Sequence, residues 1–290
     1  MITARGCDHE GRSQARAVIM SACLERTVSV SVVLPCDVTN FRNLPLIPAA
    51  PPYKTLYLLH GIYGSDLDWV LNTNIQRLAR ERQLAVVMPA GENHFYTDAG
   101  TAGARYGEFI GRELVEVTRK MFRLSERRED TFISGLSMGA YGAFMNGLRY
   151  HETFSHAACL SMTVIDEEYF RDETWLVSPL TDPGLARSVF GDPEKVRYNV
   201  KTQTALVDHL LAEGAALPEL YFAIGTEDFL LEENRAFHRF LSGRGVPHIY
   251  RESEGMHSFD FWGREIVNVL DRLPHGEKIR IQDSGNVLFG

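Results

Sequence analysis

The sequence predicts an α/β fold in which a mostly parallel sheet of eight strands carries helices on both faces. Three observations support this prediction. Short apolar runs alternate with amphipathic helical stretches over most of the chain. These runs lack strict alternation of apolar and polar residues, which is typical of strands buried on both faces. Two earlier runs show a period of two, which indicates an antiparallel pair at the start of the sheet.

The strands are expected in a fixed order along the chain. The antiparallel pair is predicted at 17–24 and 27–34, and in its second member valines alternate with serines. A connector at 45–52 contains four prolines, which exclude a helix or a central strand there. The six parallel strands are expected at Thr55–Leu59, Leu84–Met88, Thr131–Ser134, His156–Leu160, Leu220–Ile224 and His248–Arg251. Helical patterns such as Tyr106–Phe122 separate them.

One domain is expected over residues 17–273, between a polar N-terminal extension at 1–16 and a C-terminal tail at 274–290. The spacing of strands is regular except after the sixth, where a long stretch intervenes before the seventh. Within it, residues 166–200 combine aromatic side chains with charges and prolines. Long loops inside compact domains are often binding loops, so a lid-like insertion is predicted. The alternative is an insertion that packs on itself.

Composition and charge exclude several classes of protein. The 290 residues are 44% hydrophobic and 23% charged, values that are normal for a globular chain. Lys and Arg number 30 against 38 Asp and Glu, a net charge of −8, so no nucleic-acid partner is expected. Four scattered cysteines form no C-x-x-C pair, which argues against a disulfide framework or a metal knuckle. No apolar run reaches membrane-span length and no signal peptide is apparent, so we expect a cytoplasmic protein without a membrane partner.

The residues most informative about chemistry are Gly135-Leu136-Ser137-Met138-Gly139. A predicted strand enters this G-x-S-x-G motif, and a predicted helix rich in small residues leaves it. In that context the motif is typical of a nucleophile elbow, a sharp turn that exposes the serine hydroxyl. Side chains at Gly135 or Gly139 would collide with the neighbouring strand and helix. Ser137 is therefore predicted to be a nucleophile, against the alternative of a tightly packed glycine turn.

A serine hydroxyl needs a histidine base oriented by a carboxylate before it can attack an ester. In folds with this elbow the acid and then the histidine follow the serine, on loops after late strands. Asp228 follows the seventh predicted strand, and His257 follows the eighth. Both are predicted partners of Ser137. The competing acids and histidines, for which solvent-exposed, capping or structural roles are expected, are Glu227, Asp260, His60, His238 and His248.

Acyl transfer also needs two backbone N–H groups to stabilise the tetrahedral oxyanion. The first is expected from Met138, the residue after the nucleophile. The second is expected from Ile62, in the loop after the third strand, with Gly61 or Tyr63 as alternatives. The glycines of that loop let the backbone approach a substrate closely, so Gly61 is also a candidate substrate-binding residue.

Several separated motifs are informative when taken together: Tyr57-Leu58-Leu59-His60-Gly61, Asp68-Trp69, Phe95-Tyr96-Thr97-Asp98, Gly135–Gly139, Gly225-Thr226-Glu227-Asp228-Phe229-Leu230 and Gly255-Met256-His257. They resemble the esterase D group of α/β-hydrolases, most closely its tributyrin esterase branch. The similarity spans Ala17 to Leu273, although the elbow has Ala140 where that group often has a second glycine. It implies an α/β-hydrolase fold and the triad of Ser137, Asp228 and His257.

The expected function is a serine carboxylesterase that cleaves short-chain acyl esters, or small aryl or acetyl esters, through an acyl-serine intermediate. The partner would be a small-molecule ester, with no cofactor. No metal is expected, because the histidines lack H-E-x-x-H spacing. Four aromatic residues are candidate walls of the substrate pocket, each with core packing as the alternative: Tyr63, Trp69, Tyr96 and Trp175.

Other functions remain open on the same residues. An S-formylglutathione-type thioesterase, or an acyltransferase that passes the acyl group to an alcohol, could use the same triad. A non-catalytic binding protein of this fold would typically lack one of the three residues, and here all three are present. The resemblance also allows a homo-oligomer, because relatives are often dimers or tetramers.

Overall fold

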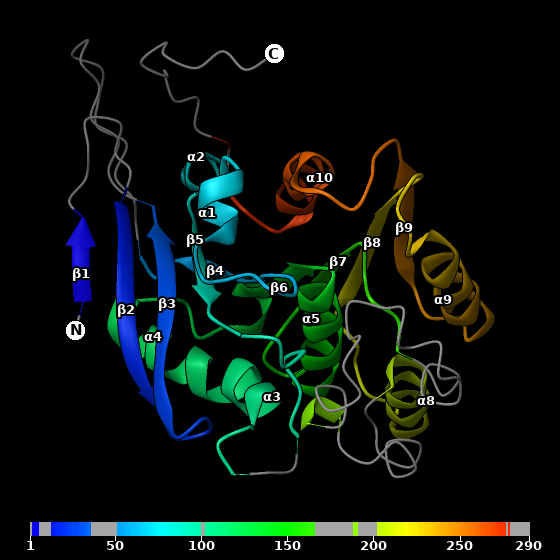
Figure 1. Ribbon diagram of the computed structural model, residues 1–290, viewed down its shortest axis with the longest axis horizontal. Helices are drawn as coiled ribbons and strands as arrows, with labels where there is room; N and C mark the ends of the chain where they lie inside the picture. Colours follow the sequence, from blue (N-terminus) through cyan, green and yellow to red (C-terminus); the bar gives the residue numbers. More distant parts are fainter. Residues whose placement is uncertain are drawn as a thin grey trace.

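The computed structural model describes residues 2–5, 13–35, 51–99, 102–165, 188–190, 202–276 and 278. A single nine-stranded sheet crosses this part of the molecule, with the spatial order β1-β2-β3-β5-β4-β6-β7-β8-β9 (Figure 1). The pairs from β1 to β5 along this order are antiparallel, and all pairs from β5 to β9 are parallel. The strands are β1 (Ile2–Arg5), β2 (Ser13–Ser21), β3 (Arg26–Leu34), β4 (Lys54–Leu59), β5 (Leu84–Pro89), β6 (Thr131–Leu136), β7 (His156–Leu160), β8 (Glu219–Gly225) and β9 (His248–Ser253).

Helices cover both faces of the sheet (Figure 1). One face packs against α1, α2 and α10, and the other against α3, α4, α5, α8 and α9. The α-helices are α1 (Asp68–Asn72), α2 (Ile75–Glu81), α3 (Tyr106–Glu108), α4 (Leu114–Phe122), α5 (Met138–Arg149), α8 (Gln203–Glu213), α9 (Leu231–Gly243) and α10 (Phe259–Arg272). Two short helical segments of other types are η1 (Phe109–Glu113) and η2 (Arg128–Asp130). This arrangement confirms the predicted α/β fold.

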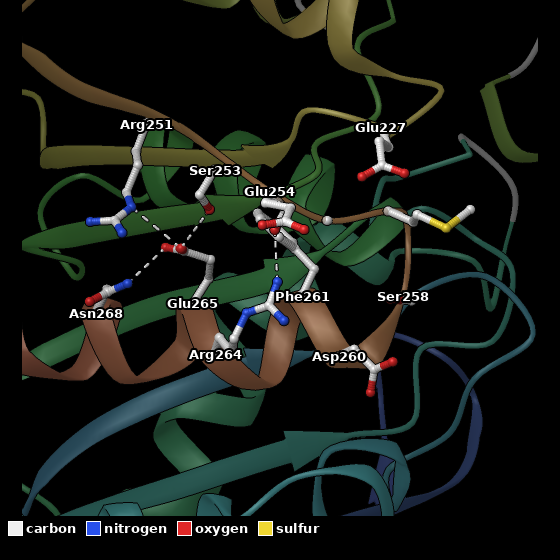
Figure 2. A pocket seen from close by; sticks show the side chains of 12 residues that line it. Glu227, Arg251, Ser253, Glu254, Ser258, Asp260, Phe261, Arg264, Glu265 and Asn268 are labelled. Atoms are coloured by element: carbon white, nitrogen blue, oxygen red, sulfur yellow. Dashed lines mark hydrogen bonds and ion pairs between the residues drawn. The ribbon is translucent and has the colours of Figure 1, made fainter. Parts of the chain in front are cut away.

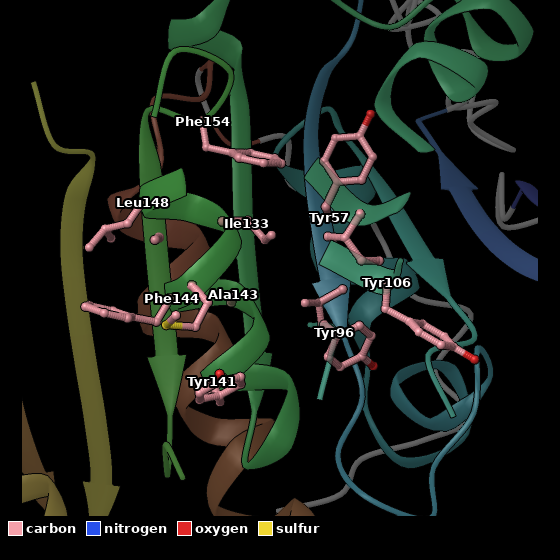
Figure 3. Packing of buried hydrophobic residues seen from close by; sticks show 14 of the residues in the cluster. Tyr57, Tyr96, Tyr106, Ile133, Tyr141, Ala143, Phe144, Leu148 and Phe154 are labelled. Atoms are coloured by element: carbon pink, nitrogen blue, oxygen red, sulfur yellow. The ribbon is translucent and has the colours of Figure 1, made fainter. Parts of the chain in front are cut away.

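The apolar runs of the central strands feed two separate cores because successive side chains point to opposite faces. In β4, Tyr57 faces the core beneath α5, whereas Leu56 and Leu58 face the core beneath α1, α2 and α10. Figure 3 shows the first of these cores, where the ring of Tyr57 meets the edge of Phe154 at a centroid distance of 5.9 Å. Burial on both faces explains why the sequence of β4 shows no alternation.

The eight predicted strands correspond to β2–β9, and β1 is an additional strand at the sheet edge. The sheet begins before the domain boundary expected at residue 16, since β2 begins at Ser13 and β1 pairs with it. Polar residues can continue a strand because backbone hydrogen bonds to the neighbouring strand hold it. Arg16 also donates hydrogen bonds from its guanidinium to Asp66, at 3.0 Å.

The predicted insertion at 166–200 lies outside the described residues except for 188–190, so its role as a lid remains a prediction. Of that short piece, Phe190 is buried and packs edge-on against Phe95, with a centroid distance of 5.2 Å. Most of the predicted tail at 274–290 also lies outside the described residues.

Candidate active site

Ser137 lies in a sharp turn between β6 and α5. Its backbone has φ +54° and ψ −119°, a conformation that non-glycine residues rarely adopt and that is often associated with active sites. A Cβ atom on Gly135 would lie 2.3 Å from the carbonyl oxygen of Gly139, and one on Gly139 would lie 2.5 Å from the carbonyl oxygen of His60. Both distances are prohibitive, so the two glycines are required for the turn, as the motif predicts.

The structure brings Ser137, His257 and Asp228 together from three loops at the carboxyl edge of the sheet. The Nε2 atom of His257 lies 3.0 Å from the Oγ atom of Ser137. Its Nδ1 atom lies 3.0 and 2.9 Å from the two carboxylate oxygens of Asp228. This is the geometry of a hydroxyl activated by an oriented imidazole, with Nδ1–H donating to the carboxylate.

The other candidate acids and histidines do not join this hydrogen-bonded chain. Glu227 lines a neighbouring cavity, and Asp260 lies in the first turn of α10. His238 and His248 pair with each other between α9 and β9, with 2.7 Å between ring nitrogens. The structural roles expected for these two histidines are thus consistent with their positions.

Asp228 is buried, and its surroundings favour the ionised carboxylate. Burial alone would raise its pKa. The hydrogen bond and charge of His257, the backbone N–H of Leu230 at 3.0 Å and the hydroxyl of Ser161 together outweigh burial and hold the pKa of Asp228 below its usual value. The carboxylate therefore stays charged at neutral pH and can hold the His257 imidazole in one orientation.

Two residues in this network, Ser161 and Trp262, were not predicted from the sequence. The indole Nε1–H of Trp262 donates to the Oγ atom of Ser161 at 3.0 Å. The same indole ring packs edge-on against His257, with 4.8 Å between ring centroids. Ser161 follows β7 at the same sheet edge as the other loops, and that position is the only sequence signal that could have pointed to it.

His60 holds the loop after β4 against its neighbours. Its Nδ1–H donates to the carbonyl oxygen of Gly61 at 2.7 Å, and its Nε2 accepts from the backbone N–H of Gly91 at 2.8 Å. Burial lowers the pKa of His60, so the ring is neutral in this tautomer. The expected bracing role of His60 agrees with these contacts.

The candidate oxyanion donors lie on both sides of Ser137. Met138 is the first residue of α5, where backbone N–H groups lack intrahelical partners. On the other side, Gly61 lies so close to the elbow that its Cβ would be 3.6 Å from the Cβ of Ser137. The backbone N–H of Tyr63 donates instead to the side-chain oxygen of Asn93 at 2.8 Å, which removes Tyr63 from the alternatives. Ile62 and Gly61 remain.

The predicted aromatic pocket walls separate into three groups. Trp69 and Tyr96 are fully buried. Trp69 donates a hydrogen bond to the carbonyl of Leu59, and Tyr96 donates one to the carbonyl of His60. Both side chains thus pack in the core, the alternative to a pocket wall. Tyr63 is exposed at the surface, with 74% of its area accessible. Trp175 lies outside the described residues.

A cavity of about 660 Å³ lies between β9 and α10, next to the segment that connects them (Figure 2). None of the three triad residues lines it. Figure 2 shows Glu265 at its floor, in contact with Arg251 and Ser253. The lining residues are Glu227, Arg251, Ser253, Glu254, Gly255, Met256, Ser258, Asp260, Phe261, Arg264, Glu265 and Asn268.

The described ranges contain neither a cluster suited to a metal ion nor a helix suited to a membrane. No group of three or more His, Cys, Asp or Glu side chains there has the arrangement of a metal site. Of the helices in that part of the chain, none has the length and apolar character needed to cross a membrane.

Residues 21–273 match the family described as "Putative esterase". The chain belongs to this esterase family. An acetyl esterase of Caldicellulosiruptor saccharolyticus is 36% identical over 251 residues, which cover 87% of this chain and 94% of that protein. The chain is thus a serine hydrolase of the esterase class with an α/β-hydrolase fold.

Two solved structures from Staphylococcus aureus are similar over nearly the whole chain. The S-formylglutathione hydrolase FrmB has a TM-score of 0.76 and 25% identity, covering 94% of this chain and 99% of that one. The fluorophosphonate-binding serine hydrolase FphF has a TM-score of 0.78 and 27% identity, covering 90% and 98%.

Proposed function

We propose that this esterase hydrolyses short-chain acyl esters, acetyl esters among them, and that Ser137, His257 and Asp228 are its catalytic residues. The observation that carries the proposal is the unbroken hydrogen-bonded chain from the Ser137 hydroxyl through His257 to the buried Asp228 carboxylate. The similarity to a protein named acetyl esterase supports the acyl size. The finer assignment to the tributyrin esterase branch is part of this proposal and rests on the sequence motifs.

The proposed reaction begins when the Oγ atom of Ser137 attacks the ester carbonyl. Its proton passes to Nε2 of His257, and the carbonyl oxygen becomes an oxyanion held by the backbone N–H groups of Met138 and Ile62. The bond to the alcohol then breaks, and His257 returns its proton to the departing alcohol oxygen. Water, deprotonated by His257, attacks the acyl-Ser137 ester in the same way and releases the acid.

The test is turnover of p-nitrophenyl acetate and p-nitrophenyl butyrate by the wild type and by Ser137→Ala. The variant is expected to lose at least ~10³-fold in kcat, and a fluorophosphonate probe should label only the wild type. Retention of most of the activity by Ser137→Ala would overturn the assignment of the nucleophile.

A thioesterase acting on S-formylglutathione is the second candidate, supported by the similarity to FrmB. The same triad would attack a thioester carbonyl, and His257 would protonate the thiolate that leaves. A kcat/KM for S-formylglutathione that exceeds the value for p-nitrophenyl acetate would favour this candidate.

The partner, location and domain assignments also remain proposals. The cytoplasm is supported by the free and buried thiols of Cys23 and Cys159, because exported chains more often pair their cysteines. A homo-oligomer is supported only by the resemblance to the esterase D group, and sedimentation would test it. The single catalytic domain over 17–273 is supported by the continuous sheet, with the addition of the strands before residue 17.

A further inference from the structure

Two large apolar side chains that adjoin triad residues in the sequence are exposed. Phe229 follows Asp228 and is 61% exposed, and Met256 precedes His257 and is 60% exposed. Single exposed apolar residues are common on protein surfaces and need no explanation. Met256 lines the cavity between β9 and α10, whereas the side chain of Phe229 contacts the triad itself.

The ring of Phe229 lies against the catalytic imidazole. Its centroid is 4.6 Å from that of His257, and the two planes are tilted by 49°. The buried Trp262 also contacts this imidazole, with ring planes at 87°. His257 is thus held between a buried aromatic ring and an exposed one, and only the exposed ring is available to a substrate.

The proposed mechanism determines which part of the substrate meets Phe229. Nε2 of His257 must deliver its proton to the oxygen of the departing alcohol, so that oxygen lies within hydrogen-bond reach of the imidazole. The atoms attached to it therefore lie near the Phe229 ring. The acyl group, by contrast, is fixed to Ser137 while the oxyanion points towards Met138 and Ile62. Phe229 is placed to contact the leaving group.

The cavity between β9 and α10 has a net negative charge. Its lining holds the carboxylates of Glu227, Glu254, Asp260 and Glu265 against the two guanidinium groups of Arg251 and Arg264 (Figure 2). Glu227 precedes the triad residue Asp228 in the chain. A leaving group that carries carboxylates and extends towards Glu227 would therefore meet like charge.

We propose that Phe229 forms the leaving-group subsite and that the negative charge of Glu227, next to Asp228 in the chain, disfavours anionic leaving groups. The subsite selects esters of uncharged aryl or alkyl alcohols over esters or thioesters of anionic carriers such as glutathione. This inference rests on the proposed esterase function and specifies the alcohol side of its substrate.

The first experiment measures kcat/KM of wild type and Phe229→Ala for 2-naphthyl acetate and methyl acetate. Phe229→Ala is expected to lower the naphthyl value by about tenfold and the methyl value by less than about twofold, because only the larger alcohol reaches the ring. Comparing variant with wild type for each ester cancels the intrinsic reactivity of the leaving group. Phe229→Trp, which keeps an aromatic surface, should restore the naphthyl rate.

The matched control is Met20→Ala, which also truncates an exposed apolar side chain, 70% accessible, but on β2 in the antiparallel part of the sheet. It should leave both rates unchanged. Titration of active sites with a fluorophosphonate normalises each rate to folded enzyme. An equal loss for both esters in Phe229→Ala would overturn the inference.

The second experiment tests charge with 4-acetoxybenzoate and its neutral methyl ester. Glu227→Gln should raise kcat/KM for the anionic substrate about threefold at low salt, should leave the neutral one unchanged, and should lose its effect at high salt. No selective gain would overturn the role of Glu227.

Failure of the inference and failure of the proposed function give different results. If the wild type neither binds the fluorophosphonate nor hydrolyses either acetate, the proposed function fails. If it hydrolyses both but prefers S-formylglutathione to naphthyl acetate, the serine hydrolase assignment stands and the proposed leaving-group selectivity is wrong.

Discussion

His60 and His257 occupy equivalent places in two loops of the same sheet edge, one after β4 and one after β9. Both have hydrogen-bond partners on each ring nitrogen. The partners of His60 are the backbone carbonyl of Gly61 and the backbone N–H of Gly91, and the residue is 1% exposed. The partners of His257 are side chains, and its own side chain is 18% exposed.

This difference shows that the kind of partner, and not the position on the fold, distinguishes a reactive histidine from a structural one. A backbone amide does not ionise near neutral pH, so the Gly91 N–H stays a donor, the Gly61 carbonyl stays an acceptor, and together they fix one neutral tautomer of His60. Ser137 can give up its proton, and the charged carboxylate of Asp228 stabilises the imidazolium that results. Only His257 can therefore cycle between protonation states.

The largest expected effect separates the two histidines by activity. His257→Gln should reduce kcat for p-nitrophenyl acetate by about 10⁴-fold, because the serine loses its base. Steady-state kinetics, normalised to folded protein, measures this loss. A comparable loss in a folded His60→Gln variant would mean that His60 also takes part in proton transfer. The distinction between a structural and a reactive histidine would then be wrong.

The next effect separates the two histidines by stability. His60→Gln should lower the free energy of unfolding by about 2 kcal/mol. Loss of the ring leaves the buried carbonyl of Gly61 and the buried N–H of Gly91 without well-placed partners. His257→Gln, at a partly exposed site, should cost less than about 1 kcal/mol. Urea denaturation followed by far-UV circular dichroism measures both, and the reverse order would contradict the structural role of His60.

A smaller effect tests the support behind the reactive histidine. Ser161→Ala removes a hydrogen bond to Asp228, so the pKa of that carboxylate should rise and kcat should fall about tenfold with little change in KM. Trp262→Phe keeps the ring packing but removes the indole N–H, and a loss of about threefold is expected. If both variants lower only the melting temperature and leave kcat per titrated active site unchanged, the two side chains are structural.

The smallest effect concerns pH. Burial lowers the pKa of His60 in the folded chain, whereas the unfolded chain titrates near the ordinary value of about 6.5. The unfolded state thus binds more protons below that pH, so the stability associated with neutral His60 is complete above about pH 6.5 and is lost on acidification. The stability difference between wild type and His60→Gln should shrink by about 1 kcal/mol between pH 7.5 and 5.5. A constant difference would show that His60 does not titrate on unfolding.

The sequence predicts features that depend on pattern and chain order. The apolar runs located β3–β9 to within a few residues, because burial on both faces leaves a strong signal. The glycines around Ser137 and the order of acid and base located the candidate triad, because this turn tolerates few sequences. β1 was missed because it is short and its pairing leaves no periodic pattern.

Features that depend on side-chain direction were harder to predict. Trp69 and Tyr96 are aromatic residues near the site, but sequence does not tell whether such a ring faces a pocket or the core, and both are buried. Phe229 is exposed, and the sequence does not reveal the direction of that side chain either. Ser161 lies next to Asp228 only after two distant strands have paired.

The position of β9 has a consequence for how activity is acquired. β9 is the last strand in sequence and in space, and its only strand partner in the described sheet is β8. Ser137 and His257 are separated by 120 positions, so the chain must close a long loop before the base reaches the nucleophile. During synthesis or refolding, a complete elbow should exist before the enzyme can turn over. The return of activity therefore reports when β9 docks and brings His257 to Ser137. Labelling of Ser137 reports the same step only because His257 activates the serine.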